Sequence, residues 1–242
     1  MSAGPQVLRL GTVGSTMDRL HELAAEGAAP GTVVVAREQT TGRGSRGRSW
    51  RSPPGGLWIS ALYRPVTAGG VELLSLRVGL AVAEAVEAAA RGARIAIKWP
   101  NDLMLGGRKL GGILCEARWQ GETLAWVVAG AGINVANPVP AELRKLAVRL
   151  ADAVPGASPE ALEPAVTARL QALAPGTGRL DPAELRALRG RDWLLNRRLH
   201  APAPGIATGI ADDGALLVRD AAGVVHEVRA GTVEVAEPTL TP

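Results

Sequence analysis

The sequence GRGSRGRSW at residues 42–50, followed directly by Arg51, is the stretch around which the rest of the chain can be interpreted. It holds no acidic residue, and its glycines let the backbone close around a ligand. Its guanidinium groups stay charged at any physiological pH, so the stretch suits an anionic ligand. A solvated surface turn is the alternative for the stretch taken alone. The arginines concerned are Arg43, Arg46, Arg48 and Arg51.

The positive charge of the chain is concentrated in this loop. Lys and Arg total 27 and Asp and Glu total 23, so the formal net charge is +4, and the four loop arginines account for all of it. Proteins that bind nucleic acid usually spread Lys and Arg along a whole face or helix. The charge pattern therefore favours a local anion site over an extended nucleic-acid surface.

The composition indicates a folded globular protein with a substantial core. The chain has 242 residues, of which 47% are hydrophobic, enough for one large domain or for one large and one small domain. Its most apolar segment, residues 73–90, is interrupted by Arg77, Glu84 and Glu87, so it does not suit a membrane span. The lone cysteine, Cys115, excludes an internal disulfide and a cysteine-based metal cluster, and no signal pattern is present. We expect a cytoplasmic protein with no membrane partner.

The first half of the chain combines short strands with two helices. Ser15 and Asp18 form a variant capping box, which predicts a helix that begins at Ser15 and ends by Gly27. An ordinary N-cap is the simpler interpretation of Ser15, although a helix N-terminus also suits a polar ligand. Helical spacing of apolar residues predicts a core helix over 70–91. Strands are predicted at 7–10, 32–36, 57–63, 94–98, 103–105, 108–118 and 123–135, so that the basic loop joins two strands.

The second half of the chain changes character at Arg191. Residues 138–190 have a helical pattern, clearest at 160–173 and 182–188. The residues after Arg191 form short strand patterns at 197–200, 206–210, 215–219, 224–229 and 232–235, separated by turn residues. This pattern predicts a small β-barrel, and hence two domains at residues 1–190 and 191–242.

Four motifs follow one another along the chain: Gln39 with GRGSRGRSW (42–50), KWPND (98–102), RKLGGIL (108–114) and GAGINV (130–135). Each motif is weak alone, but the ordered set resembles the biotin protein ligases, from about Val7 to the C-terminus. The resemblance implies an α/β (α+β) fold. Its catalytic domain would be class II synthetase-like, of the biotin–lipoate ligase type with a mixed sheet, followed by a small SH3-like β-barrel.

The resemblance implies a ligase reaction in two steps. The carboxylate of biotin first attacks the α-phosphate of ATP, with Mg²⁺ accompanying the nucleotide, and gives biotinyl-5′-AMP and pyrophosphate. A lysine of a biotin carboxyl carrier domain, as in acetyl-CoA carboxylase, then attacks the acyl phosphate. Both steps gather negative charge on phosphate oxygens, which fixed positive groups stabilise.

The resemblance also implies roles for the motif residues. The biotin site would comprise Ser15, Thr16, Gln39, Gly42, Arg43, Gly44, Ser45, Lys109, Gly111, Gly112, Gly130 and Gly132. The nucleotide site would comprise Arg46, Arg48, Trp50, Lys98, Asn101, Asp102 and Asn134. The catalytic residues would be Arg43, Lys98, Asp102 and Lys109, with no metal ligand from the protein. Asp102 would orient or deprotonate the carrier lysine, whose pKa is about 10.4 when free; a turn-capping role is the alternative.

One position departs from the pattern of the family. Many members have the sequence GRGRRGR, whereas this chain has Ser45 at the fourth position. A neutral hydroxyl cannot clamp an anion as a guanidinium can. We expect either a less tightly held adenylate or compensation by another arginine.

Three alternative functions each have a distinguishing feature. Biotin ligases that are also repressors carry an N-terminal helix-turn-helix, and only six residues precede the first predicted strand, so we expect no DNA binding. A lipoate/octanoate-type acyltransferase needs a Cys–Lys pair, but Lys109 and Cys115 would lie about 20 Å apart on a regular strand. A non-catalytic ligand-binding module would release no pyrophosphate from ATP. His21, His200 and His226 show no metal-ligand spacing, and a monomer and a weak homodimer both remain open.

Overall fold

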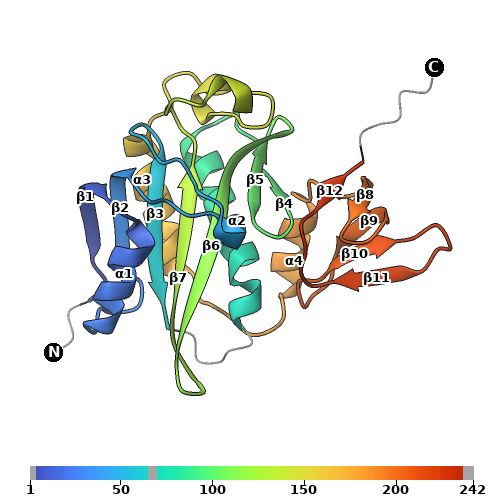
Figure 1. Cartoon of the computed structure of the whole chain (residues 1–242), viewed down its shortest axis with the longest axis horizontal. Coiled ribbons are helices and arrows are strands. Elements are labelled where there is room, and N and C mark those ends of the chain that lie inside the picture. The colour runs from blue at the N-terminus through green and yellow to red at the C-terminus, as the bar shows by residue number, and fades with distance from the viewer. Residues whose placement is uncertain (1–3, 65–69, 237–242) are drawn as a thin grey trace.

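The computed structural model describes residues 4–64 and 70–236 of the chain. Within these residues, a seven-stranded mixed sheet carries helices on both faces, and a five-stranded antiparallel sheet lies beside it (Figure 1). The α/β architecture and the small C-terminal β unit predicted from the sequence are both confirmed.

The strands of the larger sheet have the order β1-β2-β3-β7-β6-β5-β4. Strands β1 and β2 are parallel, and the other neighbouring pairs are antiparallel, so the sheet is mixed as predicted. The β6–β7 hairpin extends beyond the other strands at one end of the sheet (Figure 1). The strand bounds are Val7–Val13 (β1), Val33–Gln39 (β2), Leu57–Tyr63 (β3), Ala96–Lys98 (β4), Asp102–Leu105 (β5), Arg108–Gln120 (β6) and Thr123–Ile133 (β7).

Alternate residues of the central strands face opposite sides of this sheet. In β7, Val127 and Ala129 pack in the main hydrophobic core, whereas Trp126 and Val128 pack in a second, smaller core. Helices α2 (Val71–Ala89) and α3 (Pro159–Ala172) cover the main core, and α1 (Thr16–Ala25) covers the smaller one. With ten residues, α1 leaves part of its face of the sheet uncovered. None of the described helices is both long and apolar enough to cross a bilayer.

Helix α1 begins where the sequence predicts. Ser15 is its N-cap, and the Ser15 hydroxyl accepts a hydrogen bond from the backbone N–H of Met17 at 3.2 Å. The other half of the predicted capping box is wrong, because the Asp18 carboxylate binds the guanidinium of Arg43 instead of the Ser15 backbone. The first turn of α1 is thereby tied to the basic loop.

The helical pattern predicted for 138–190 is only partly correct. Helices α3 and α4 (Pro182–Arg189) form, but residues 138–157 are irregular, with short 3₁₀ turns at Ala141–Leu143 and Leu150–Asp152. This segment bonds to the ends of two strands: the Lys109 backbone pairs with residues 146 and 148, and the Asn134 carbonyl accepts from the Leu150 amide at 2.9 Å. Amides used in this way are not available to a helix. The segment therefore crosses the ends of β6 and β7.

The smaller sheet packs directly against the larger one. Ile97 of β4 forms a parallel bridge with Asp192, and the indole N–H of Trp99 donates to the Gly214 carbonyl at 2.9 Å. Buried side chains of the smaller sheet, such as Leu199 and Leu216, belong to the main core. Its strands have the order β11-β10-β9-β8-β12, with bounds Arg198–Ala201 (β8), Gly205–Ile210 (β9), Leu216–Arg219 (β10), Val225–Val228 (β11) and Glu234–Val235 (β12).

Candidate active site

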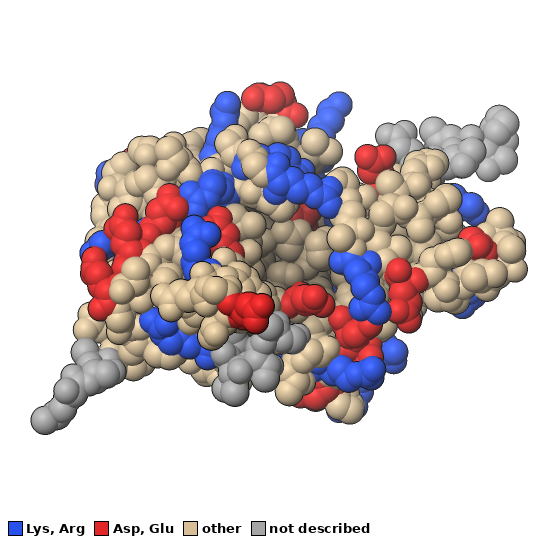
Figure 2. Space-filling view, turned by 60° about the horizontal axis from the view of Figure 1, so that its bottom comes forward, with Lys and Arg blue, Asp and Glu red and all other residues tan. Residues whose placement is uncertain are grey.

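A cavity of about 390 Å³ opens on the face of the larger sheet that α1 leaves uncovered. Its floor contains three glycines: Gly112 of β6 lies opposite Gly132 of β7, and Gly130 lies opposite Leu114. On the same face, β7 carries Trp126 where α1 covers the sheet. The glycines omit the side chains that would otherwise fill this space, so the sheet itself makes room for a ligand. Figure 2 shows a hollow of the surface with basic side chains around it.

The basic loop between β2 and β3 folds as a hairpin beside this floor, with bridges from Gln39 to Ser52 and from Arg43 to Ser49. The Trp50 side chain lies on Gly132, where an added Cβ atom would be 2.6 Å from Trp50 Nε1. The indole N–H of Trp50 is buried and has no hydrogen-bond partner among the described residues. A buried donor without a partner is costly, so Trp50 Nε1 is an atom that a bound ligand could satisfy.

Two neutral polar side chains, Thr16 and Gln39, line one end of the cavity, and two neighbouring serines hold them in place. The backbone N–H and the hydroxyl of Thr16 both donate to Gln39 Oε1, at 2.9 and 3.0 Å. Because the Thr16 hydroxyl proton is used in this way, the hydroxyl of Ser60, 2.7 Å away, donates to Thr16 Oγ1. Gln39 Nε2 donates to Ser52 Oγ at 2.8 Å. Thr16 and Gln39 were predicted from the sequence, whereas Ser60, a single serine in an apolar strand, carries no motif.

A cation lies at the centre of the cavity wall. Lys109 Nζ forms an ion pair with Asp102 Oδ1 at 2.6 Å, and it lies 5.2 Å from the centre of the Trp50 ring. The pair lies beside Gly112, where an added Cβ atom would be in van der Waals contact with Lys109 Nζ at 3.5 Å. Residues predicted for the biotin site, the nucleotide site and catalysis therefore meet at one point.

Lys98 lies just behind this point and does not line the cavity. It is opposite Asp102 in the β4–β5 pair, and its ammonium is 5.6 Å from the centre of the Trp193 ring. Burial lowers the pKa of Lys98, and the positive charges of Lys109 and Arg48 lower it further, whereas Asp102 opposes the shift. Lys98 can therefore act on a ligand through its charge more readily than through direct contact.

The four loop arginines are not equivalent. Arg43 donates to both oxygens of Asp18, at 2.7 and 2.8 Å, and to Glu116 at 3.3 Å, so two carboxylates offset its charge. Arg48 donates to the Ser45 hydroxyl at 3.0 Å and lines the cavity. The sequence shows no acid within the loop, but the fold brings two acids to it from α1 and β6.

Asn101 and Asn134 both line the cavity and also hold its backbone in place. Asn101 Nδ2 donates to the Ile113 carbonyl at 2.7 Å. Asn134 Oδ1 accepts from Asn137 Nδ2 at 3.1 Å, and Asn137 Oδ1 accepts from the Val135 amide. Asn137, which no sequence motif indicates, therefore fixes the turn at the end of β7.

Most of the residues predicted for the site line one cavity. Gly42, Arg46, Lys98 and Gly111 do not. An added Cβ at Gly42 would lie 2.7 Å from Ser52 Oγ inside the hairpin, and one at Gly111 would collide with the Gly132 carbonyl. These two glycines permit close packing of the protein with itself. The predicted residues that do line the cavity are Ser15, Thr16, Gln39, Arg43, Gly44, Ser45, Arg48, Trp50, Asn101, Asp102, Lys109, Gly112, Gly130, Gly132 and Asn134.

An apolar rim on the segment after β7 was not predicted. Val139, Leu143 and Leu146 line the cavity, and the two leucines are 41% and 69% exposed. In the sequence, the spacing of the leucines resembles that of a surface helix, so the pattern did not indicate that they line a cavity. The fold places this apolar surface beside the basic loop.

Cys115 is not part of this site. It packs against the main core and does not line the cavity. Burial raises the pKa of its thiol to about 12. A thiol with that pKa is a poor nucleophile at neutral pH, because the thiolate is the reactive form.

Comparison with known families agrees with the motif order, the mixed sheet and the cavity. Residues 11–134, just over half of the chain, match the Biotin/lipoate A/B protein ligase family. The chain belongs to this family. Residues 196–235, which contain all five strands of the smaller sheet, match the Biotin protein ligase C terminal domain.

Individual members of the biotin/lipoate A/B protein ligase family are similar over different lengths. The chain is 35% identical to the biotin--[acetyl-CoA-carboxylase] ligase of Paracoccus denitrificans over 217 residues, 82% of this chain and 88% of that protein. It is 39% identical to the bifunctional ligase/repressor BirA of Bacillus spizizenii over 155 residues, 62% of this chain and 47% of that protein, and so spans about half the length of this relative. The structure of the biotin protein ligase from Aquifex aeolicus in complex with biotin and ATP has a TM-score of 0.76 at 24% identity, over 96% of this chain and 99% of that one. The likeness to the Aquifex protein establishes the biotin protein ligase fold.

Proposed function

We propose that the chain is an ATP-dependent biotin–protein ligase, which activates biotin as biotinyl-5′-AMP and transfers it to a lysine of a biotin carboxyl carrier domain. The observation that carries this proposal is the cavity lined both by the neutral pair Thr16 and Gln39 and by the cation Lys109. A neutral polar recess suits an uncharged ureido ring, and a nearby ammonium suits a carboxylate or acyl phosphate. The Paracoccus denitrificans relative is a biotin--[acetyl-CoA-carboxylase] ligase, and the similar Aquifex aeolicus structure contains biotin and ATP, which supports the proposal.

Biotin would lie along the glycine floor of the cavity. Its ring would be bound by Ser15, Thr16 and Gln39, beside the apolar side chain of Met17, and its carboxylate would extend to Lys109. Arg43, Gly44 and Ser45 keep a place in this biotin site because they line the cavity. Gly42 and Gly111 would contribute indirectly, by allowing the hairpin and the sheet to pack closely.

ATP would occupy the part of the cavity that is bordered by the apolar rim. Val139, Leu143 and Leu146 offer a surface for the adenine ring, and Asn101, Asn134 and the buried Trp50 N–H offer polar contacts. Arg48 and Lys98 would supply positive charge near the phosphates, with Arg46 reaching them from the loop. Mg²⁺ would enter with the nucleotide, whose phosphates supply oxygen ligands of the kind that this ion prefers.

The residues around Lys109 would act in both steps. In the first step, a biotin oxygen bonds to the α-phosphorus and pyrophosphate leaves, while Lys109 and Lys98 offset the negative charge. In the second step, the carrier amine bonds to the acyl carbon, AMP leaves, and the amine loses a proton. Asp102 would accept that proton or orient the amine, after exchanging its partner Lys109 for the incoming lysine.

Pyrophosphate release from ATP tests the proposal. Biotin should stimulate release in the absence of carrier protein, whereas lipoate and octanoate should not. If none of the three acids stimulates pyrophosphate release, that result would contradict the ligase assignment and favour a binding module. Transfer from an acyl donor without ATP would favour the lipoate/octanoate acyltransferase, which the raised pKa of the partly buried Cys115 disfavours. Added EDTA should stop release if Mg²⁺ accompanies the nucleotide.

We also propose the division of the chain into a catalytic domain, residues 1–190, and a C-terminal domain, residues 191–242. The change from α4 to the five strands that begin with β8 supports this boundary. A cytoplasmic location, the absence of DNA binding, and a monomeric or weakly dimeric state stay predictions from the sequence.

A further inference from the structure

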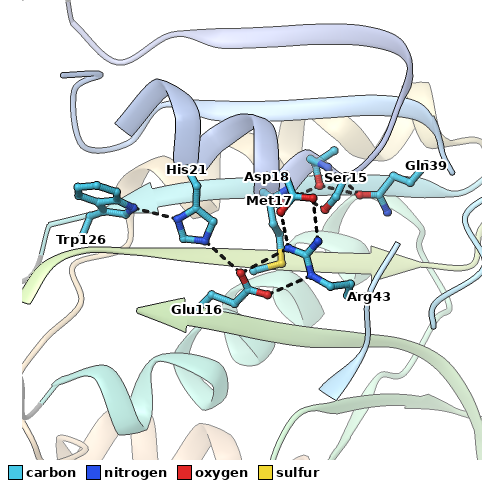
Figure 3. Close-up of polar contacts among 10 residues, drawn as sticks. Ser15, Met17, Asp18, His21, Gln39, Arg43, Glu116 and Trp126 are labelled. Carbon is cyan, nitrogen blue, oxygen red and sulfur yellow. Dashed lines mark hydrogen bonds and ion pairs between the residues drawn. The ribbon is translucent and has the colours of Figure 1, made fainter. Parts of the chain in front are cut away.

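A continuous chain of polar side chains leads from the core under α1 to the basic loop (Figure 3). Trp126 Nε1 donates to His21 Nδ1 at 3.0 Å, and His21 Nε2 lies 3.1 Å from Glu116 Oε2. Glu116 accepts from Arg43 at 3.3 Å, and Arg43 donates to both oxygens of Asp18. Helix α1, strands β6 and β7, and the loop each contribute to this chain.

The chemistry of Trp126 fixes the proton on His21. An indole N–H can only donate, so Nδ1 of His21 must accept, and the imidazole proton is on Nε2. The Nε2–H group then donates to Glu116. Burial lowers the pKa of His21, and the charge of Arg118 lowers it further, whereas Glu116 and Asp18 oppose the shift. A neutral His21 thus holds Glu116 in one orientation.

The orientation of Glu116 in turn determines where Arg43 lies. The side chains of Arg43 and Glu116 are 33% and 23% exposed, so their contact is partly shielded from water. Asp18 holds the other edge of the same guanidinium. The planar guanidinium fork is therefore fixed from α1 and from β6, which anchors the first residues of the basic loop.

We propose that Trp126, His21 and Glu116 are positioning residues, which anchor the basic loop at Arg43 and so keep the loop in place over the bound substrate. None of these three lines the cavity, whereas Arg43 does, so they act through Arg43. The inference rests on the proposed function, since it concerns the biotin end of the same cavity. If Asp18 and Glu116 instead hold Arg43 away from the substrate, which is the opposite relationship, loss of the Glu116 charge should increase the affinity for biotin.

Two variants with a matched control test the proposal. Glu116→Gln keeps the size of the side chain and removes its charge, and Trp126→Phe keeps an aromatic ring and removes the N–H. Glu163→Gln is the control, because Glu163 also pairs with an arginine, Arg9, at 2.6 Å and does not line the cavity. Circular dichroism and thermal unfolding establish that each variant is folded.

The first measurement is biotin affinity by calorimetry without ATP. We expect Glu116→Gln to weaken biotin binding about tenfold, as the loss of one charge-assisted contact implies, and Glu163→Gln to leave it unchanged. The second measurement is trypsin cleavage of the loop at residues 43–51 in the absence of ligand, which should become faster in Glu116→Gln. Unchanged affinity with unchanged cleavage overturns the proposal, and tighter biotin binding overturns it in favour of the opposite relationship.

The third measurement separates positioning from a purely structural role. When His21 is protonated, its Nδ1–H would face the Trp126 N–H, so that two donors would meet. The charged imidazole would also compete with Arg43 for Glu116 and place a positive charge beside Arg43 and Arg118. Biotin binding should therefore weaken at low pH. The charged groups facing His21 are Asp18, Glu116, Arg118 and Arg43. Trp126→Phe removes the opposing donor, so the midpoint of this loss should move to higher pH. An unmoved midpoint contradicts the role of Trp126.

These outcomes are distinct from a failure of the proposed function. If the native protein releases no pyrophosphate and binds no biotin, the ligase proposal fails. The cleavage measurement still decides whether Glu116 anchors the loop, because it needs no substrate. If the native protein is an active ligase and the variants match it, the anchoring proposal alone fails.

Discussion

The Lys109 ammonium and the Asp102 carboxylate form an ion pair, with Nζ 2.6 Å from Oδ1. Their side chains are 30% and 24% exposed, so both can reach a ligand in the cavity. The resemblance to the biotin protein ligases implies that Lys109 holds the biotin carboxylate and later the acyl phosphate, and that Asp102 acts on the carrier lysine. Because Lys109 and Asp102 contact each other, both steps would use the same ion pair, whose members can exchange partners.

Replacement of Asp102 should separate the two steps. In Asp102→Asn we expect biotin-dependent pyrophosphate exchange to stay within about threefold of the native rate, while transfer to carrier falls on the order of 100-fold, as for the loss of a general base. Single-turnover transfer from preformed biotinyl-5′-AMP measures the second step alone. Asp152→Asn is the control, because Asp152 pairs with Arg149 and does not line the cavity. Equal losses in both steps would assign Asp102 to holding Lys109.

Trp193 links the C-terminal part of the chain to Lys98. Its ring centre is 5.6 Å from Lys98 Nζ and 4.0 Å from Arg197 Cζ. A cation–π contact contributes about 0.5–2 kcal/mol, so Trp193→Leu should lower the rate of adenylation by about 2- to 30-fold. Initial rates of pyrophosphate exchange measure the effect, with biotin affinity expected to stay unchanged. The exposed Trp119, replaced by Leu, is the control, and an equal loss there would point to general destabilisation.

Ser45 has a specific partner, since its hydroxyl accepts from Arg48 at 3.0 Å and its carbonyl from Arg48 Nε at 3.3 Å. Ser45→Arg adds a charged donor and should slow release of the adenylate by about tenfold, the effect of one charge-assisted hydrogen bond. Ser45→Ala removes the hydroxyl contact with Arg48, keeps the carbonyl contact, and should speed release by a smaller factor. Dissociation of biotinyl-5′-AMP in the absence of carrier is the measurement. Equal dissociation rates of biotinyl-5′-AMP from the native protein and from Ser45→Arg would contradict this prediction.

Cys115 should be dispensable for chemistry. Its pKa of about 12 and its contact with the main core indicate a packing role. We expect Cys115→Ala to keep both half-reactions within about twofold of the native rates, with a loss of stability on the order of 1 kcal/mol. Loss of acyl transfer in a folded Cys115→Ala variant would favour the lipoate/octanoate-type acyltransferase instead.

Asp18 should make the protein more stable above pH 4 than below it. Hydrogen bonds from Arg43 lower the pKa of Asp18 from its usual 3.8. A lowered pKa in the folded state means that the stabilisation is complete above the unfolded value and is lost as the pH falls through the folded value. The free energy of unfolding should therefore differ between the native protein and Asp18→Asn at pH 6, and the difference should shrink below pH 4. A difference that stays constant across this range would show that the charge of Asp18 is not responsible.

The local elements of this fold could be predicted because each depends on short-range pattern. The helical spacing of apolar residues in Val71–Ala89, the nearly continuous apolar run in Leu57–Tyr63 and the Ser15 cap each act within a few positions of the chain. The family resemblance, carried by the ordered motifs, likewise implied one site for Thr16, Gln39 and Lys109, and these residues line one cavity.

The sequence alone could not determine which charges meet. It determined that a basic glycine-rich loop joins two strands, but Arg43 finds Asp18 at a separation of 25 residues and Glu116 at a separation of 73. The tertiary structure also decided that residues 138–157 bond to strand ends, although their pattern is helical. Periodicity and capping are properties of neighbours along the chain. Ion pairs, buried donors and cavities depend on which elements the fold brings within a few ångströms of one another.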